Sequence, residues 1–138
     1  MKTVLVVEDN ESLREIFHLA LSRGGYAVLT APDGASALAL AEKIESEGIV
    51  LLTDLILPEM NGWELAAQFI RRHPTARVGV MSGATHSSEF AGPDILLKPF
   101  SLVELVDFVT ELCYSTTPKR PQGVVTNADG RTGTAFNI

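Results

Sequence analysis

Five polar residues of this sequence stand just after short apolar segments: Glu8, Asp9, Asp54, Ser82 and Lys98. Three of them are acids, and carboxylates that converge on one place have raised pKa values unless a cation lies among them. Mg²⁺ suits such a cluster, because it accepts one or two carboxylates together with phosphate oxygens and keeps several waters. These residue types therefore indicate a divalent-metal site, provided that the fold brings the segments together.

The lysine and the serine extend this chemistry to phosphoryl groups. Lys98 offers a cation and Ser82 a hydroxyl donor, and both groups can bind phosphoryl oxygens. With positive charge spread over those oxygens, an exposed carboxylate such as Asp54 can serve as the nucleophile. Each residue taken singly also has a structural reading, as a helix cap, a turn residue or a solvated lysine. Together they predict a phosphoryl acceptor site.

Apolar periodicity predicts the elements that would position these residues. Five short runs are typical of strands: Thr3–Val7, Tyr26–Ala31, Ile49–Thr53, Arg77–Met81 and Asp94–Leu97. The first of them is continuously apolar, which is typical of a strand buried on both faces. Helical spacing predicts four apolar stripes: Leu13, Ile16, Phe17, Ala20 and Leu21; Ala37, Leu40, Ala41 and Ile44; Leu65, Ala66 and Phe69; and Leu102, Leu105, Val106, Val109, Leu112 and Cys113.

Cap residues mark where several of these helices begin. Asn10 or Asp9 can cap the first helix and Asp33 the second, while Ser101 and Glu104 have the spacing of a capping box. Strands that alternate with helices predict a doubly wound α/β fold, because parallel strands need crossover connections. Ligands of such folds bind beyond the carboxyl ends of the strands, which is where the five polar residues lie.

Composition limits the class of protein. A chain of 138 residues has room for one domain and a tail, and its net charge of −6 argues against binding nucleic acid or an anionic membrane. The single cysteine, Cys113, cannot form an internal disulfide. The sequence shows neither a signal peptide nor an apolar run of about 20 residues. We therefore expect a cytoplasmic protein.

The charge changes sign at Ser115. Residues 1–114 contain 8 basic and 16 acidic residues, a net charge of −8, whereas residues 115–138 contain 3 and 1, a net charge of +2. The second part is rich in turn-forming residues and has no apolar period. We predict a domain over residues 1–114 and a flexible basic tail over residues 115–138. A short strand within this tail is an alternative that the sequence leaves open.

Four segments resemble the receiver domains of bacterial two-component response regulators: Val4–Asn10, Thr53–Gly62, Met81–Gly83 and Lys98–Phe100. The resemblance spans about residues 2–113, and it is specific because all four segments occur in order. It implies a CheY-like, flavodoxin-like (βα)5 fold whose five-stranded parallel sheet has the strand order 2-1-3-4-5. A softer likeness links the chain to the receivers of hybrid histidine kinases.

The resemblance also assigns roles to residues. It implies that Asp54 is phosphorylated, that Glu8, Asp9 and Asp54 bind Mg²⁺, and that the backbone carbonyl of Ile56 is a further metal ligand. It implies that the Ser82 hydroxyl moves toward the phosphoryl group and that Lys98 pairs with that group.

A cis peptide bond at Lys98–Pro99 is a further feature that the resemblance implies. The expected protein is not an enzyme but a phosphoacceptor in a phosphorelay, which assists its own phosphorylation and dephosphorylation. A sensor histidine kinase or a histidine phosphotransfer protein would be the donor. The sequence leaves open which protein is the downstream partner and whether the chain forms a homodimer. No direct contact with nucleic acid or membrane is expected.

Two departures from the family pattern keep alternatives open. The stretch Gly83–Asp94 is short, which predicts a shortened fourth helix, and Ile95 stands where the family commonly has Tyr or Phe. A receiver-like interaction module that needs no phosphate is therefore the alternative. A Mg²⁺-dependent phosphohydrolase is a third reading, which Ile56 disfavours because many such enzymes have a second aspartate at that position.

Overall fold

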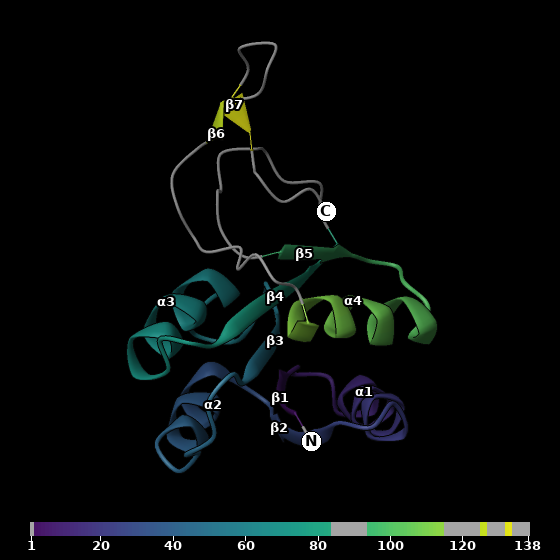
Figure 1. The fold of residues 1–138 in the computed structure, drawn as a ribbon, viewed down its shortest axis with the longest axis horizontal. Helices are drawn as coiled ribbons and strands as arrows, with labels where there is room; N and C mark the ends of the chain where they lie inside the picture. Colours follow the sequence, from purple (N-terminus) through teal and green to yellow (C-terminus); the bar gives the residue numbers. More distant parts are fainter. Residues whose placement is uncertain (1, 84–93, 115–124, 127–131, 134–138) are drawn as a thin grey trace.

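The five predicted strands form one parallel sheet in the computed structural model, which describes residues 2–83, 94–114, 125–126 and 132–133 (Figure 1). The strands are β1 (Thr3–Val7), β2 (Ala27–Ala31), β3 (Val50–Asp54), β4 (Arg77–Ser82) and β5 (Asp94–Leu97). Their order in the sheet is β2-β1-β3-β4-β5, which confirms the doubly wound, flavodoxin-like fold. The order reverses between β1 and β3, because the chain goes from β1 to β2 on one side and continues from β3 on the other.

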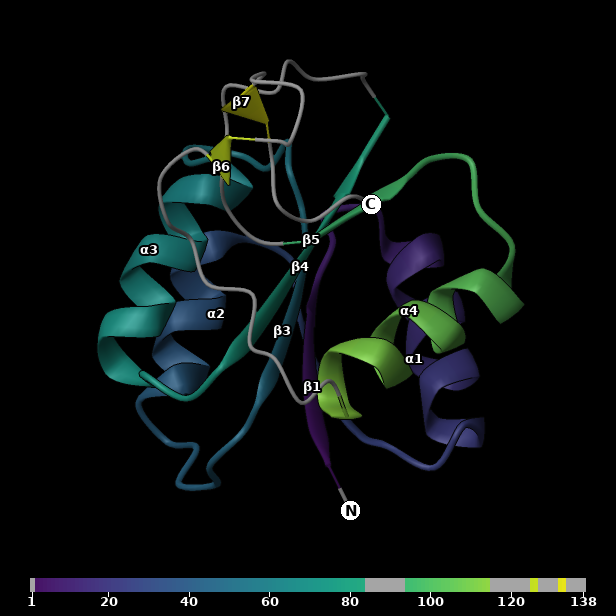
Figure 2. The ribbon, with the colours of Figure 1, turned by 45° about the horizontal axis from the view of Figure 1, so that its top comes forward.

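Helices cover both faces of the sheet. They are α1 (Glu11–Arg23), α2 (Gly34–Ala41), α3 (Gly62–Arg72) and α4 (Leu102–Tyr114). Figures 1 and 2 show α1 and α4 on one face of the sheet and α2 and α3 on the other. Within the described part of the chain, no helix is long and apolar enough to cross a membrane.

Two apolar cores result from the alternation of side chains along the central strands. Val4, Val6 and Leu52 pack with α1 and α4, whereas Leu5 and Leu51 pack with α2 and α3. All of these side chains are fully buried. The predicted continuous apolar runs therefore reflect strands that are covered on both faces.

The predicted caps are present. The Asn10 side chain accepts a hydrogen bond from the backbone of α1, and the Asp33 side chain accepts one from the backbone of α2. Ser101 and Glu104 form the reciprocal bonds of a capping box at the start of α4. These bonds satisfy backbone N–H groups that the first turn of a helix leaves without partners.

Two of the predicted helical faces differ from the structure. On α1 only Phe17 and Leu21 are buried, whereas Leu13 and Ile16 are more than a third exposed, because α1 packs on the sheet through a narrow face. The second helix ends at Ala41 and does not continue to Ile44. The chain tightens after the helix, since the N–H groups of Lys43 and Ile44 donate to carbonyls three residues earlier.

Two predictions concern regions outside the described residues. The shortened fourth helix falls between β4 and β5, where residues 84–93 are not described. Most of the predicted tail is also outside the described part. The residues of the tail that are described form β6 (Val125–Thr126) and β7 (Thr132–Gly133), which pair as antiparallel strands. The flexible basic tail over residues 115–138 therefore stays a prediction.

Candidate functional site

The site lies at the carboxyl ends of β1 and β3, the two neighbouring strands between which the strand order reverses. The last residue of β1, Val7, is in register with Thr53 of β3. The residues that follow, Glu8 and Asp54, therefore stand side by side at the edge of the sheet. Strand pairing alone thus brings together two acids that are 46 positions apart in the sequence.

Three carboxylates meet at this edge. One carboxylate oxygen from each of Glu8, Asp9 and Asp54 lies within 4.8 Å of the other two. Glu8 and Asp54 are buried, whereas Asp9 is exposed. The acids that the sequence predicted to converge therefore do so, and the cluster is open to solvent on the side of Asp9.

Glu8 is the least solvated member of the cluster, with an exposed fraction of 2%. Its Oε2 atom accepts a hydrogen bond from the backbone N–H of Asn10 over 3.1 Å, whereas its Oε1 atom is buried without a hydrogen-bond partner among the described residues. Burial raises the pKa of the Glu8 carboxyl, and the negative charge of Asp54 adds to this rise. A buried carboxylate oxygen without a hydrogen-bond donor is suited to a cation, which would compensate for its lost solvation.

Asp54 has a cationic partner on the other side. The Nζ atom of Lys98, at the end of β5, donates to Asp54 Oδ2 over 3.1 Å. The lysine is held at the edge because its backbone N–H donates to the carbonyl of Ser82 over 2.8 Å. The peptide bond between Lys98 and Pro99 is cis, as the resemblance implies.

Ser82 and Ile56 lie on the neighbouring segments. Ser82 ends β4 and is buried, and it follows Met81, which is in register with Asp54. Ile56 is 75% exposed in the loop after β3, and it forms a bridge with Asn61. The predicted site residues are thus all placed at one end of the sheet.

Gly62 lies at the site, where the sequence predicted no role for it. Its N–H donates to the carbonyl of Leu55 over 2.7 Å, and a methyl group on its Cα would lie 2.6 Å from the carbonyl oxygen of Asp54. The start of α3 therefore packs directly on the backbone of Asp54. Its place at the end of the segment Thr53–Gly62, which resembles the receiver family, was a signal for this residue, but it does not say which backbone lies opposite.

Arg14 is a second such residue. Its guanidinium donates to the backbone carbonyl of Glu8 over 2.8 Å. A lone arginine on a polar helix face gives no signal of this contact, because most such arginines are solvated.

The donor set fits a hard divalent cation. Three carboxylate oxygens within 4.8 Å of one another, one of them on an acid with a buried oxygen that lacks a partner, are ligands of the kind that Mg²⁺ prefers. The backbone carbonyl of the exposed Ile56 is on an adjacent loop. Glu8, Asp9 and Asp54 are the residues that would hold the ion.

Known proteins resemble this chain in sequence. The profile of the response regulator receiver domain matches residues 4–110. The response regulator receiver protein CpdR of Brucella abortus is 34% identical over 119 residues, which cover 81% of this chain and 97% of CpdR. The sensor kinase CckA of the same organism is 34% identical over 116 residues, which cover 80% of this chain.

Solved structures agree. The receiver domain of the hybrid histidine kinase CckA has a TM-score of 0.71 at 31% identity, and the match covers 80% of this chain and 98% of that one. TrrA of Thermotoga maritima, in complex with Mg²⁺ and BeF, has a TM-score of 0.70 at 27% identity, with 81% and 99% covered. The chain spans 25% of NtrC of Azospirillum brasilense and 12% of CckA, so it matches one part of these larger proteins.

Proposed function

The chain belongs to the response regulator receiver domain family, and from this membership we propose that it accepts a phosphoryl group on Asp54 in two-component signal transduction. The observation that carries the proposal is the position of the Asp54 carboxylate. It lies between two acids suited to a divalent cation and a lysine that pairs with it over 3.1 Å. A carboxylate with metal ligands on one side and a fixed cation on the other is prepared for a phosphoryl group.

The reaction is a transfer from nitrogen to oxygen. A carboxylate oxygen of Asp54 attacks the phosphorus of a phosphohistidine, so that a P–O bond forms while the P–N bond breaks. The histidine nitrogen keeps the electron pair of the broken bond and takes a proton from water. Lys98 and the Ser82 hydroxyl then bind oxygens of the new acyl phosphate. Mg²⁺, when bound, supplies positive charge to the phosphoryl oxygens.

The donor in this proposal is a sensor histidine kinase or a histidine phosphotransfer protein. The likeness to the receiver of the hybrid histidine kinase CckA supports a donor of this kind. Phosphorylation adds charge at the edge of the sheet and would change a protein-binding surface near β5 and α4. The protein would act as a switch and not as an enzyme that turns over a separate substrate.

The alternative is an interaction module that needs no phosphate. Ile95 favours it, since this side chain is buried in β5 beside Val80 and has no hydroxyl or ring with which to report on the site. The acidic cluster and the Asp54–Lys98 pair favour the phosphoacceptor, because an interaction module has no need of three converging carboxylates.

Intact mass after incubation with Mg²⁺ and acetyl phosphate tests the proposal. We expect one added phosphoryl group on the wild-type chain and none on Asp54→Ala. The matched control is Asp107→Ala, which removes an exposed aspartate of α4 and should leave the adduct unchanged.

Three results would contradict the phosphoacceptor. An absence of adduct with every phosphodonor tried would favour the interaction module. Continuous turnover of the donor would favour a phosphohydrolase. An adduct that persists in Asp54→Ala would place the acceptor on another residue.

A further inference from the structure

We propose that Arg14 is a positioning residue of the acidic site. Arg14 holds the peptide unit between Glu8 and Asp9 and so sets the direction of the Asp9 carboxylate. The inference rests on the proposed function, because it concerns the Mg²⁺ that the phosphoryl transfer would use.

The contact runs from α1 back to the end of β1. Arg14 lies in the first turns of α1, and its Nη1 atom donates to the backbone carbonyl of Glu8 over 2.8 Å. Side chains of an α-helix point toward its N-terminus, which explains how the guanidinium reaches a residue six positions earlier. The side chain is half-buried, so this bond competes less with water than a bond on the open surface would.

The Glu8 carboxylate does not depend on this contact. The backbone N–H of Glu8 donates to the carbonyl of Ala31 over 3.1 Å, and its Oε2 atom accepts from Asn10. These two bonds place the Glu8 residue by themselves. The bond from Arg14 acts at the carbonyl, which is the part of Glu8 that leads to the next residue.

The residue that depends on the contact is Asp9. A peptide unit is planar, so fixing the direction of the Glu8 carbonyl also fixes the N atom and the Cα of Asp9. Asp9 is the exposed acid of the three, and it has the least packing to orient its side chain. Rotation of this peptide would swing the Asp9 carboxylate away from Glu8 and Asp54. Arg14 therefore keeps the third metal ligand in place.

Mg²⁺ affinity of the full chain measures this role. Trp63 is the single tryptophan, and it follows Gly62, which packs on the Asp54 backbone, so its fluorescence is the readout of a Mg²⁺ titration. We compare the wild type with Arg14→Met, which keeps the apolar stem but has no N–H donor. We expect the Kd for Mg²⁺ to rise about three- to tenfold, which is the size of effect that the net contribution of one typical hydrogen bond produces.

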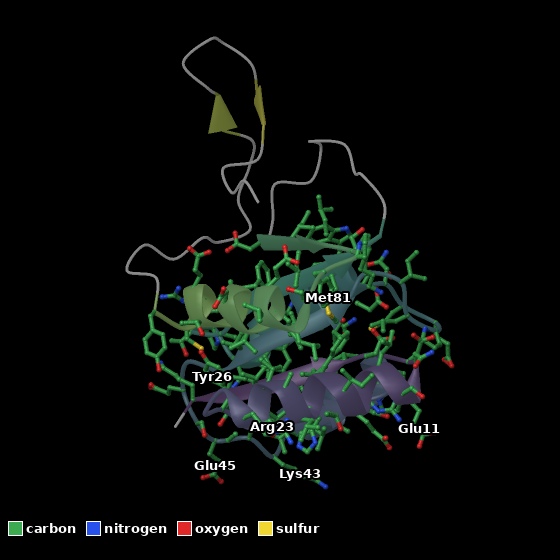
Figure 3. The ribbon with its side chains drawn as sticks, turned by 90° about the vertical axis from the view of Figure 1, so that its right-hand side faces the viewer. Glu11, Arg23, Tyr26, Lys43, Glu45 and Met81 are labelled. Carbon is green, nitrogen blue, oxygen red and sulfur yellow. The ribbon has the colours of Figure 1, made fainter. Side chains whose placement is uncertain are left out.

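Two further variants separate positioning from general helix effects. Arg14→Lys keeps one ammonium donor and should recover part of the affinity. Arg23→Ala removes an exposed arginine from the last turn of the same helix and should leave the Kd unchanged. Figure 3 shows Arg23 further along α1 from Glu11, which lies at the end where the helix begins.

A split in the kinetics adds a readout that a merely structural role would not move. The phosphorylation rate of Arg14→Met with acetyl phosphate should approach that of the wild type once Mg²⁺ is saturating, because the residue acts on ligand placement and not on the reacting atoms. Should Arg14→Met fail to fold, Arg14→Gln takes its place, since its amide is too short to reach the carbonyl.

The outcomes distinguish this inference from the proposed function. A wild-type chain that binds no Mg²⁺ would overturn both. A wild-type chain that binds Mg²⁺, with an unchanged Kd in Arg14→Met or an equal loss in Arg23→Ala, would overturn the role of Arg14 alone.

Discussion

At the scale of single residues, two glycines that begin helices meet very different neighbours. A methyl group at Gly62 would contact the carbonyl oxygen of Asp54 and lie 3.1 Å from the Cα of Leu55, both of them backbone atoms. At Gly34 the methyl group would contact the side chain of Met60 instead. A thioether side chain can change rotamer, whereas a strand end in a sheet cannot move alone. Gly62 is therefore required by the site, and Gly34 is not.

We expect Gly62→Ala to lower the free energy of unfolding by about 2–3 kcal/mol, the cost of overpacking a site that cannot relax. Gly34→Ala should cost less, about 1 kcal/mol or below, because Met60 can yield and alanine favours a helix. Urea denaturation of both variants checks the difference. Equal losses of unfolding free energy in the two variants would show that the backbone of Asp54 is not rigid.

At the scale of elements, the caps join local sequence to the placement of the helices. The N-cap Asp33 accepts a hydrogen bond from the backbone N–H of Ser36 over 2.7 Å, and this bond lowers the pKa of the Asp33 carboxyl below its ordinary value. A carboxyl whose pKa is lower in the folded state adds stability above its unfolded-state pKa. That stability is lost as the pH falls through the folded-state pKa.

Substitution Asp33→Asn isolates this effect, because asparagine caps a helix as well but does not titrate. We expect the wild type to lose stability relative to Asp33→Asn as the pH falls from about 5 to about 2, where the carboxyl becomes protonated. Other carboxyls titrate in both chains and cancel in the difference. Chemical denaturation of both chains over this pH range measures the difference in their free energies of unfolding. Curves of stability against pH that run parallel would contradict the role of the charged cap.

At the scale of the whole molecule, the sheet concentrates negative charge at one edge. The strand order places the ends of β1 and β3 side by side, so that Glu8, Asp9 and Asp54 share a small volume with Lys98. Repulsion among the three carboxylates opposes folding, and the single positive charge of Lys98 does not balance it. A bound divalent cation would offset the repulsion and stabilise the folded chain.

We therefore expect Mg²⁺ to raise the thermal stability of the wild type, by about 2–3 kcal/mol at a concentration a hundredfold above its Kd. The variant Asp9→Asn should lose most of this Mg²⁺-dependent gain, since one ligand charge is gone. Asp107→Asn, on the exposed side of α4, should keep it. Thermal unfolding with and without Mg²⁺ checks the three chains, and an equal gain in Asp9→Asn would place the ion elsewhere.

The sequence by itself determined the strands, the helix caps and the residue types of the site, because these depend on local pattern. A continuous apolar run indicates a strand buried on both faces, and a capping residue three positions before its partner indicates a helix start. The sequence also shows that Glu8, Asp9 and Asp54 come directly after predicted strands. Those signals were enough to predict the sheet and the convergence of Glu8, Asp9 and Asp54.

Only the tertiary structure decided which side chains are buried and which backbone atoms the site packs against. Leu13 and Ile16 follow the apolar spacing of α1, yet they remain exposed because the helix covers the sheet through a narrow face. Gly62 and Arg14 act on the backbones of Asp54 and Glu8, contacts that link segments from separate elements. Periodicity records the environment of a residue along one element, whereas these contacts depend on how several elements pack in space.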